Sequence, residues 1–150
     1  MTIEHIFTRP TSGAPQTTLP QVTVVAGAGI VGDRNFGKVG EAGTNVTFIE
    51  AEEIESFLQE QQRPYDLSIT GRNVVTRGVR LNELLGQEFT VGGVRFRGVE
   101  LCEPCSKLGK LLQSPGLPPA QAVKRWAHRA GLRADALTGG ELAIGASVVP

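Results

Sequence analysis

Residues 21–44 read QVTVVAGAGIVGDRNFGKVGEAGT, and this stretch decides between two fold classes. Its first six residues are rich in β-branched side chains and predict a strand, after which the glycines at positions 27, 29 and 32 match a dinucleotide-binding fingerprint. That fingerprint works only where a helix begins at the glycines, because the helix N-terminus faces the pyrophosphate. Residues 33–44 contain three further glycines, each costing about 1 kcal/mol relative to alanine in a helix. We therefore interpret these glycines as turn formers and not as a nicotinamide-dinucleotide site.

The composition favours a β-rich domain with many loops. The chain has 150 residues, which is a common length for one domain, and we expect a single domain over residues 1–150. It contains 19 glycines and 9 prolines but only 6 phenylalanines, 1 tyrosine and 1 tryptophan. Many turn residues and few helix formers argue against a helical bundle.

Charge and hydropathy exclude two kinds of partner. The chain has 15 basic and 15 acidic residues, whereas a general nucleic-acid binder needs a basic excess to displace counterions from phosphates. No apolar run approaches the roughly 20 residues of a membrane span, and the N-terminal MTIEHIFTRP lacks the apolar run of a signal peptide. We expect a cytoplasmic protein that binds neither nucleic acid nor membranes.

The order of predicted elements is that of an α+β fold that is mainly β. Residues 51–61 form the clearest helix, because Ile54, Phe57 and Leu58 share one face. The Gly92–Gly93 pair between two β-type runs predicts a hairpin. Strands are predicted over residues 4–8, 21–26, 45–50, 66–70, 71–78, 88–93, 94–101 and 141–149. A second helix is predicted over residues 104–112. A third helix is predicted to begin at Pro118–Pro119 and to continue through an apolar stripe that includes Trp126. The sum is a compact, β-barrel-like domain with about three short helices.

Two cysteines, three residues apart in VELCEPCSKLGKLL, are the strongest chemical signal. A strand ends near Cys102, Pro104 is expected to start a helix, and Cys105 then falls in its first turn. Exposed N–H groups and the positive end of the helix dipole lower a cysteine pKa there, and Lys107 and Lys110 act in the same direction. Such a thiolate suits a nucleophile, a persulfide carrier or a soft-metal ligand.

Spacing alone leaves several interpretations of the pair open. A dithiol exchange pair matches C-x-x-C followed by a helix, although only 45 residues follow Cys105. A zinc site needs two more ligands, and His5 and His128 are the only histidines. One or both cysteines can also be small core residues, which is the usual state of a free cysteine.

Residues 71–80, GRNVVTRGVR, hold Arg72, Arg77 and Arg80 with no acidic residue between them. Arginines offer forked donors that suit phosphate or carboxylate, but the two ends of a strand need not share one site. Asn73 beside Arg72 fits either a turn or a ligand contact. Asp33 and Arg34, within the glycine-dense stretch, are candidate site residues or a structural ion pair.

These motifs together resemble a known family. In order the chain shows AGAGIVGDRNFG, NVTFIEAEEIESF, GRNVVTRGVRLNELLGQEF, ELCEPCSKL, AHRAGLRADALTGG and ELAIGASVV. This order is similar to that of the MOSC domain, named for the C-terminal domain of molybdenum-cofactor sulfurases, and in particular to its small stand-alone bacterial members. The likeness extends from about Ala26 to Val149.

The resemblance implies a β-barrel-like fold, molybdenum cofactor as the ligand, and a cysteine preceded by proline as the reactive residue, which Pro104–Cys105 matches. In cofactor-binding relatives that cysteine is the ligand to molybdenum, and in the sulfurases it has been proposed to carry sulfur as a persulfide. Gly32, Asp33, Arg34, Arg72 and Asn73 match the family's glycine-rich loop and its Arg/Asn segment, and we include Arg77 among the candidate cofactor contacts. The family's loop often reads GDRH, whereas Asn35 stands at the last position here.

Three functions follow as hypotheses. The first is a domain that binds molybdenum cofactor, or carries sulfur for it, through Cys105, and that reduces N-hydroxylated compounds if it is an enzyme. The second is a non-enzymatic carrier, itself independent of pyridoxal phosphate, that serves a cysteine desulfurase or a molybdoenzyme. The third is a dithiol redox protein in which Cys102 is the resolving thiol for Cys105.

Overall fold

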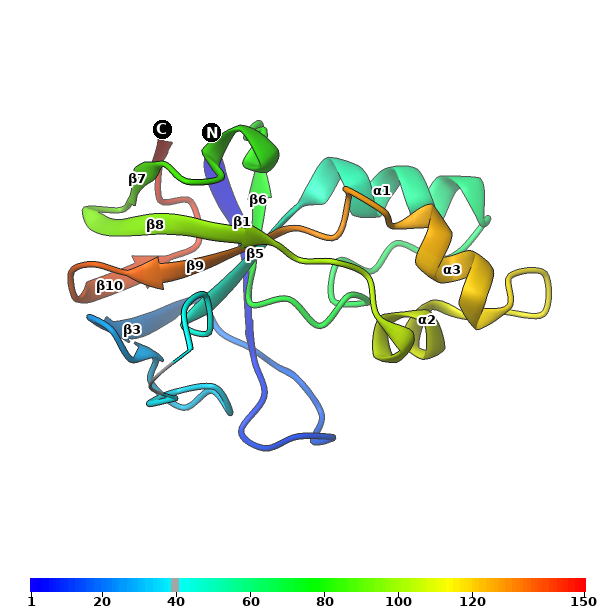
Figure 1. Cartoon of the computed structure of the whole chain (residues 1–150), viewed down its shortest axis with the longest axis horizontal. Coiled ribbons are helices and arrows are strands. Elements are labelled where there is room, and N and C mark those ends of the chain that lie inside the picture. The colour runs from blue at the N-terminus through cyan, green and yellow to red at the C-terminus, as the bar shows by residue number, and fades with distance from the viewer. Residues whose placement is uncertain (39–40) are drawn as a thin grey trace.

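The computed structural model describes residues 1–38 and 41–150, so Gly40 of the glycine-dense stretch lies outside the described residues. Figure 1 shows the strands gathered on one side of the molecule and the α-helices on the other. The strands are β1 (Thr2–Thr8), β2 (Thr17–Thr18), β3 (Gln21–Val25), β4 (Gly29–Ile30), β5 (Val46–Glu50), β6 (Val74–Arg77), β7 (Glu88–Val91), β8 (Val94–Leu101), β9 (Leu132–Ala136), β10 (Gly140–Ala143) and β11 (Val148–Val149). The helices are α1 (Ala51–Glu60), α2 (Ser106–Leu112) and α3 (Pro119–Arg125), and a 3-10 helix spans Leu81–Leu84.

The strands form two sheets. The larger sheet has the order β11-β7-β8-β9-β5-β6-β1-β2, and the smaller has the order β10-β3-β4. Their paired strands run antiparallel except β5 and β6, which are parallel. A parallel pair needs a crossover between its strands, and α1 provides it. The curled larger sheet with three short α-helices among the described residues confirms the α+β, mainly β prediction.

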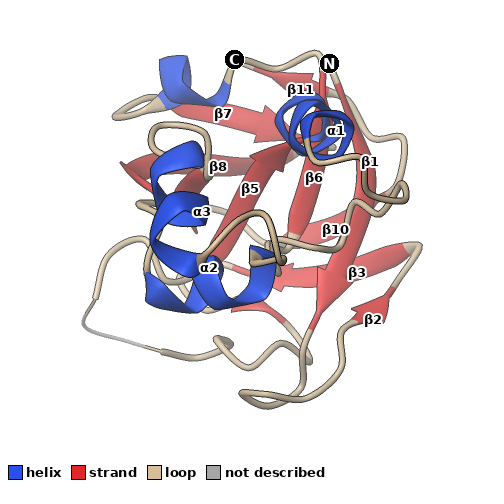
Figure 2. Ribbon diagram, turned by 90° about the vertical axis from the view of Figure 1, so that its right-hand side faces the viewer, coloured by secondary structure: helices blue, strands red, loops and turns tan. Residues whose placement is uncertain are grey.

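Alternation along the central strands builds two hydrophobic clusters on opposite faces of the larger sheet. In β5, Phe48 joins the cluster enclosed by the strands, whereas Ile49 joins the cluster beneath the helices. Val74 and Val75 divide in the same way in β6, as the period of two requires. Figure 2 shows α1, α2 and α3 in front of the strands, where they cover the second cluster, and the indole of Trp126 is fully buried there.

The glycine-dense stretch forms turns, as predicted, and its described part lacks the helix that a dinucleotide-binding fingerprint requires. Residues 27–28 are a turn, β4 follows, and within the described part of residues 31–44 the backbone forms turns and bends with no helix. The hairpin at Gly92–Gly93 is also confirmed. It joins β7 to β8 with φ values of +54° and +88°, as a two-residue turn with two left-handed positions demands.

Two predicted strands are wrong in extent. Residues 66–70 form a turn, because Asp66 Oδ1 accepts hydrogen bonds from the Ser68 N–H and hydroxyl and so holds the backbone in a local turn. The predicted strand over residues 141–149 is two strands, β10 and β11. The turn between them contains Gly145 at φ +89°, and β10 and β11 belong to different sheets.

β9 has no counterpart among the predicted strands, and the third helix ends earlier than predicted. The strand reads LRADA and pairs with both β5 and β8, although its residues have little intrinsic β preference. Its pairing shows that tertiary context overrides propensity at this position. α3 ends at Arg125, and residues 126–129 form turns.

Candidate functional site

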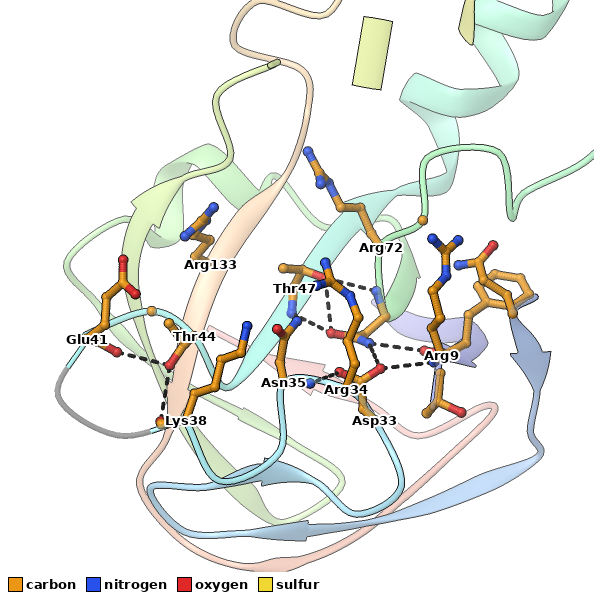
Figure 3. Close-up of a pocket in the computed structure, with 16 residues that line it drawn as sticks. Arg9, Asp33, Arg34, Asn35, Lys38, Glu41, Thr44, Thr47, Arg72 and Arg133 are labelled. Carbon is orange, nitrogen blue, oxygen red and sulfur yellow. Dashed lines mark hydrogen bonds between the residues drawn. The ribbon is translucent and has the colours of Figure 1, made fainter. Parts of the chain in front are cut away.

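A polar cavity of about 320 Å³ lies where β1 ends and β6 begins, between the loop of residues 9–16 and residues 33–38 and 41–44. Figure 3 shows its lining side chains, which come from segments far apart in the sequence. Its basic residues are Arg9, Arg34, Lys38, Arg72 and Arg133, and its acidic residues are Asp33 and Glu41. The cavity is therefore locally cationic although the whole chain is neutral.

Asp33 is a buried anchor for the cavity wall. Its carboxylate accepts the backbone N–H of Arg9 at 3.1 Å, the backbone N–H of Asn35 at 3.1 Å and the side-chain amide of Asn73 at 3.2 Å. Only 7% of the residue is exposed, so these donors replace most of its hydration. Asp33 thereby holds two loops and the start of β6 together, and Gly32 at φ +90° turns the chain into this position.

The side chain of Asn73 uses its full hydrogen-bonding capacity within the protein. Its Nδ2 donates to the Phe7 carbonyl at 3.1 Å and to Asp33, while its Oδ1 accepts from the backbone N–H and the hydroxyl of Thr47, both at 3.1 Å. The Asn73 backbone N–H donates in return to the Thr47 hydroxyl at 2.9 Å. Asn73 therefore links β1, β5 and the glycine-rich loop, and we interpret it as a residue that positions these segments around the cavity.

Three cations of the cavity lack a carboxylate partner. Within residues 1–38 and 41–150, the side chains of Arg9, Arg34 and Lys38 form no ion pair. Arg133 approaches Glu100 only at 3.5 Å. Arg72 donates its Nε to the Ala130 carbonyl at 3.0 Å and forms no ion pair within the described residues. Unpaired cations around one hollow favour an anionic ligand such as a phosphate.

Cys105 is an exposed thiol at the start of α2. It is the N-cap residue, so the helix begins at Ser106 and the prediction that Pro104 starts the helix with Cys105 in its first turn is corrected by two residues. Pro104 cannot donate a backbone hydrogen bond, and it holds the extended entry to the helix. The backbone N–H groups of Leu108 and Lys107, followed by the charge of Arg72, lower the pKa of Cys105.

Cys102 is the opposite kind of thiol. It is 4% exposed within the cluster beneath the helices, and burial raises its pKa although the charges of Arg72 and Arg133 oppose that change. Both cysteines are free thiols. Of the two, Cys105 is therefore the accessible thiol.

Arg72 connects the thiols to the cavity. It lines the cavity, and its charge opposes the rise in the pKa of Cys102 and contributes to the fall in the pKa of Cys105. Of the candidate cofactor contacts, Asp33, Arg34, Arg72 and Asn73 line one cavity, whereas Gly32 and Cys105 do not belong to its lining.

Arg77 and Arg80 lie elsewhere. Arg77 is at the other end of β6, where it donates to Glu4 at 2.7 Å and forms two hydrogen bonds with Glu55, and it does not line the cavity. Five residues along a strand span about 16 Å, which separates Arg77 from Arg72. The candidate anion cluster over residues 72–80 therefore does not assemble.

Three of the cavity's cations are not among the predicted site residues, namely Arg9, Lys38 and Arg133. Arg9 follows a strand in a turn-rich stretch, and Arg133 lies on the unpredicted β9, so neither belonged to a recognisable pattern. Within the described part of the chain, no group of three or more histidine, cysteine or acidic side chains is arranged to hold a metal ion. In the same residues, no helix is long and apolar enough to cross a bilayer.

The structure is thus a mainly β domain with a cationic cavity and an exposed thiol of lowered pKa. The model of the MOSC domain matches residues 34–149, so the chain belongs to the MOSC domain family. A search of curated proteins finds no match.

Solved structures share this fold. The YuaD protein from Bacillus subtilis superimposes with a TM-score of 0.82 at 20% identity, over 99% of this chain and 94% of YuaD. YiiM from Geobacillus stearothermophilus superimposes with a TM-score of 0.72 at 21% identity, over 99% of this chain and 73% of that YiiM. YiiM from Escherichia coli superimposes with a TM-score of 0.69 at 14% identity, over 99% of this chain and 69% of that YiiM.

Proposed function

We propose that this chain binds the molybdenum cofactor, with the cofactor's phosphate in the cationic cavity and the thiolate of Cys105 as ligand to molybdenum. The observation that carries the proposal is the electrostatic link through Arg72 between the cavity and a thiol of lowered pKa. The family associates with this cofactor, which makes it the first ligand to test.

The residues present fit such a group. A volume of about 320 Å³ is at the lower end of small-molecule sites, which span roughly 300–1,000 Å³. Unpaired guanidinium and ammonium groups suit a phosphate, and a soft thiolate suits molybdenum. When bound, the molybdenum centre supplies two-electron redox chemistry.

The chain's own residues divide the remaining work. Arg9, Arg34 and Lys38 bind the anion, and Arg72 both lines the cavity and favours the thiolate of Cys105. Asp33 and Asn73, which also line the cavity, fix the loops through their hydrogen bonds. The reaction class we propose is reduction of an N-hydroxylated compound to the amine with loss of water, which consumes two electrons from a partner electron donor in the cytoplasm and two protons from solvent.

Anaerobic purification tests cofactor binding. Molybdenum measured by mass spectrometry and pterin measured by fluorescence are expected to co-purify with the wild-type protein and with Cys102→Ser. Both are expected to be lost in Cys105→Ser, in which a hydroxyl replaces the soft ligand. Equal molybdenum and pterin in the two serine variants contradicts the role of Cys105.

Exposure of Cys105 supports a second candidate, a sulfur carrier. The Cys105 thiolate attacks the outer sulfur of a cysteine desulfurase persulfide, a new S–S bond forms, and the desulfurase thiolate leaves. The carrier step needs no pyridoxal phosphate, and a molybdoenzyme is the expected recipient. A gain of 32 Da on Cys105, absent in Cys105→Ser, is the expected mass-spectrometric result, based on the persulfide chemistry of thiols.

The two candidates and the dithiol alternative give different results. If neither molybdenum nor added sulfur is found while a Cys102–Cys105 disulfide forms and breaks reversibly, the protein is a dithiol redox protein. Burial and the raised pKa of Cys102 disfavour that outcome, because a buried protonated thiol attacks slowly.

A further inference from the structure

A second cavity, lined by Arg9, Ser12, Arg34, Lys107 and Lys110 among others, adjoins the first. Its volume is about 360 Å³, and it shares Arg9 and Arg34 with the first cavity. In Figure 3 these two arginine side chains rise from different loops in the same direction. The two hollows therefore meet along one boundary that is made of guanidinium groups.

The second cavity is more one-sided in charge than the first. Four of its lining residues are cations, and none is a carboxylate. Lys107 and Lys110 are three residues apart on α2, so their side chains share one face of the helix. Neither forms an ion pair within the described residues. Four like charges around one hollow repel each other, and an anion removes that repulsion.

We propose that this second cavity binds a phosphate-type anion in addition to the anion of the first cavity. Lys107 and Lys110 hold it from α2, Arg9 and Arg34 hold it from the boundary, and the Ser12 hydroxyl is a neutral donor. Because α2 also carries Cys105 at its start, the second anion lies on the thiol's side of the site. The inference deepens the proposed function, on which its biological meaning rests, by stating that the site takes two anionic groups.

Two sources fit this chemistry. One ligand with two anionic groups can span both cavities, or a phosphorylated substrate can occupy the second cavity while the cofactor occupies the first. Anion binding itself can be measured without either ligand, so it does not depend on cofactor loading.

The test uses inorganic phosphate as the probe and backbone amide chemical shifts as the readout. Titration of the cofactor-free protein is expected to give saturable shifts both at residues 43–47, around the first cavity, and at residues 107–111, around the second. Lys107→Gln with Lys110→Gln removes two cations found only in the second cavity. It is expected to weaken phosphate binding at residues 107–111 by roughly fivefold to thirtyfold and to change binding at residues 43–47 by less than about twofold.

Two matched variants complete the design. Lys38→Gln with Arg133→Gln removes two cations found only in the first cavity, and it is expected to produce the reverse pattern. Lys124→Gln with Arg80→Gln removes two exposed charges outside both cavities, and it is expected to leave both titrations unchanged. The proposal is overturned if residues 107–111 show no saturable shift, or if all three double variants weaken binding there equally.

A final titration on cofactor-loaded protein separates the two sources. If the amide shifts of residues 107–111 still change on addition of phosphate, the second cavity is free for a second ligand. If they no longer change, the bound cofactor already occupies the second cavity, and one ligand spans both cavities. If phosphate binds the cofactor-free protein as described but no cofactor co-purifies, the proposed function fails while the second anion site remains.

Discussion

Replacement of Asn73 by alanine separates a positioning role from a ligand contact. The substitution removes four side-chain hydrogen bonds, to Phe7, Asp33 and both the N–H and the hydroxyl of Thr47. At about 1 kcal/mol for each neutral bond and about 1.5 kcal/mol for the bond to a carboxylate, the loss is about 4.5 kcal/mol. Water from the adjoining cavity can satisfy some of the exposed groups, so we expect about 3 kcal/mol.

Thermal and urea unfolding measure this cost. The buried indole of Trp126 is a fluorescence probe in the helical layer, and circular dichroism reports the sheets. For a domain of this size, about 3 kcal/mol corresponds to a fall in melting temperature of roughly 10 °C. Asn82→Ala is the matched control, because this exposed asparagine donates one hydrogen bond, to the His128 carbonyl, and its loss is expected to cost less than about 1 kcal/mol.

A loss below about 1 kcal/mol in Asn73→Ala, accompanied by loss of cofactor, refutes the positioning role and makes Asn73 a ligand contact. Asn73→Asp adds a second test with a pH dependence. The introduced carboxyl would lie beside the Asp33 carboxylate, so its pKa is raised above the ordinary value of about 3.9. A carboxyl whose pKa is raised in the folded state contributes to stability while it is protonated at low pH, and this contribution is lost as the pH rises through the folded-state pKa. The free energy of unfolding of Asn73→Asp is therefore expected to be lower at pH 7 than at pH 4, relative to the wild-type protein.

Three further predictions concern the thiols, the surface and the backbone. The rate at which iodoacetamide alkylates Cys105 is expected to rise with pH with a midpoint below the ordinary thiol pKa of about 8.5, because the pKa of Cys105 is lowered. Cys102 is expected to be alkylated only on unfolding. Equal alkylation of the two cysteines in the folded protein, measured by peptide mass spectrometry, contradicts this prediction. Arg77→Ala is expected to cost about 1 kcal/mol or less in urea unfolding, because its partners are partly exposed, and to leave phosphate binding unchanged. Gly131→Ala is expected to cost more than about 3 kcal/mol in thermal unfolding, because its backbone has φ +104° and an added Cβ overlaps the Phe48 carbonyl oxygen of β5. Gly37→Ala is the matched control. Its backbone also has a positive φ, but an added Cβ meets no neighbouring atom, so the expected cost is about 1–2 kcal/mol.

The sheet was largely predictable because its strands carry their own signals. The runs QVTVV and VVTR are rich in β-branched residues, and the glycine pair at 92–93 has the two left-handed positions that its hairpin requires. β9 was not predictable, because LRADA is held by pairing on both sides and not by its composition. Local preference identifies strands only where it agrees with the tertiary structure.

The site was predictable only in part because its residues meet in space and not in sequence. Cys105 stood out because it follows a proline and precedes a helix, and both features are local. The cavity's cations come from loops and from β9, where no periodicity marks a single arginine. Arg77 was grouped with Arg72 by proximity in sequence, but a strand carries two such residues to opposite ends.

The opposite pKa changes of the two cysteines show how the fold divides one short motif. Arg72 favours the thiolate of both residues, yet the pKa of Cys102 rises and that of Cys105 falls. The difference arises from the environment, because Cys102 lies at the end of β8 with its N–H bonded to the Gly131 carbonyl at 2.8 Å and its side chain in the core. Cys105, three residues later, meets the free N–H groups of α2 in solvent. Since burial outweighs a shared arginine, the pKa of the core thiol rises, and we expect the exposed sulfur at the start of α2 to be the one that reacts.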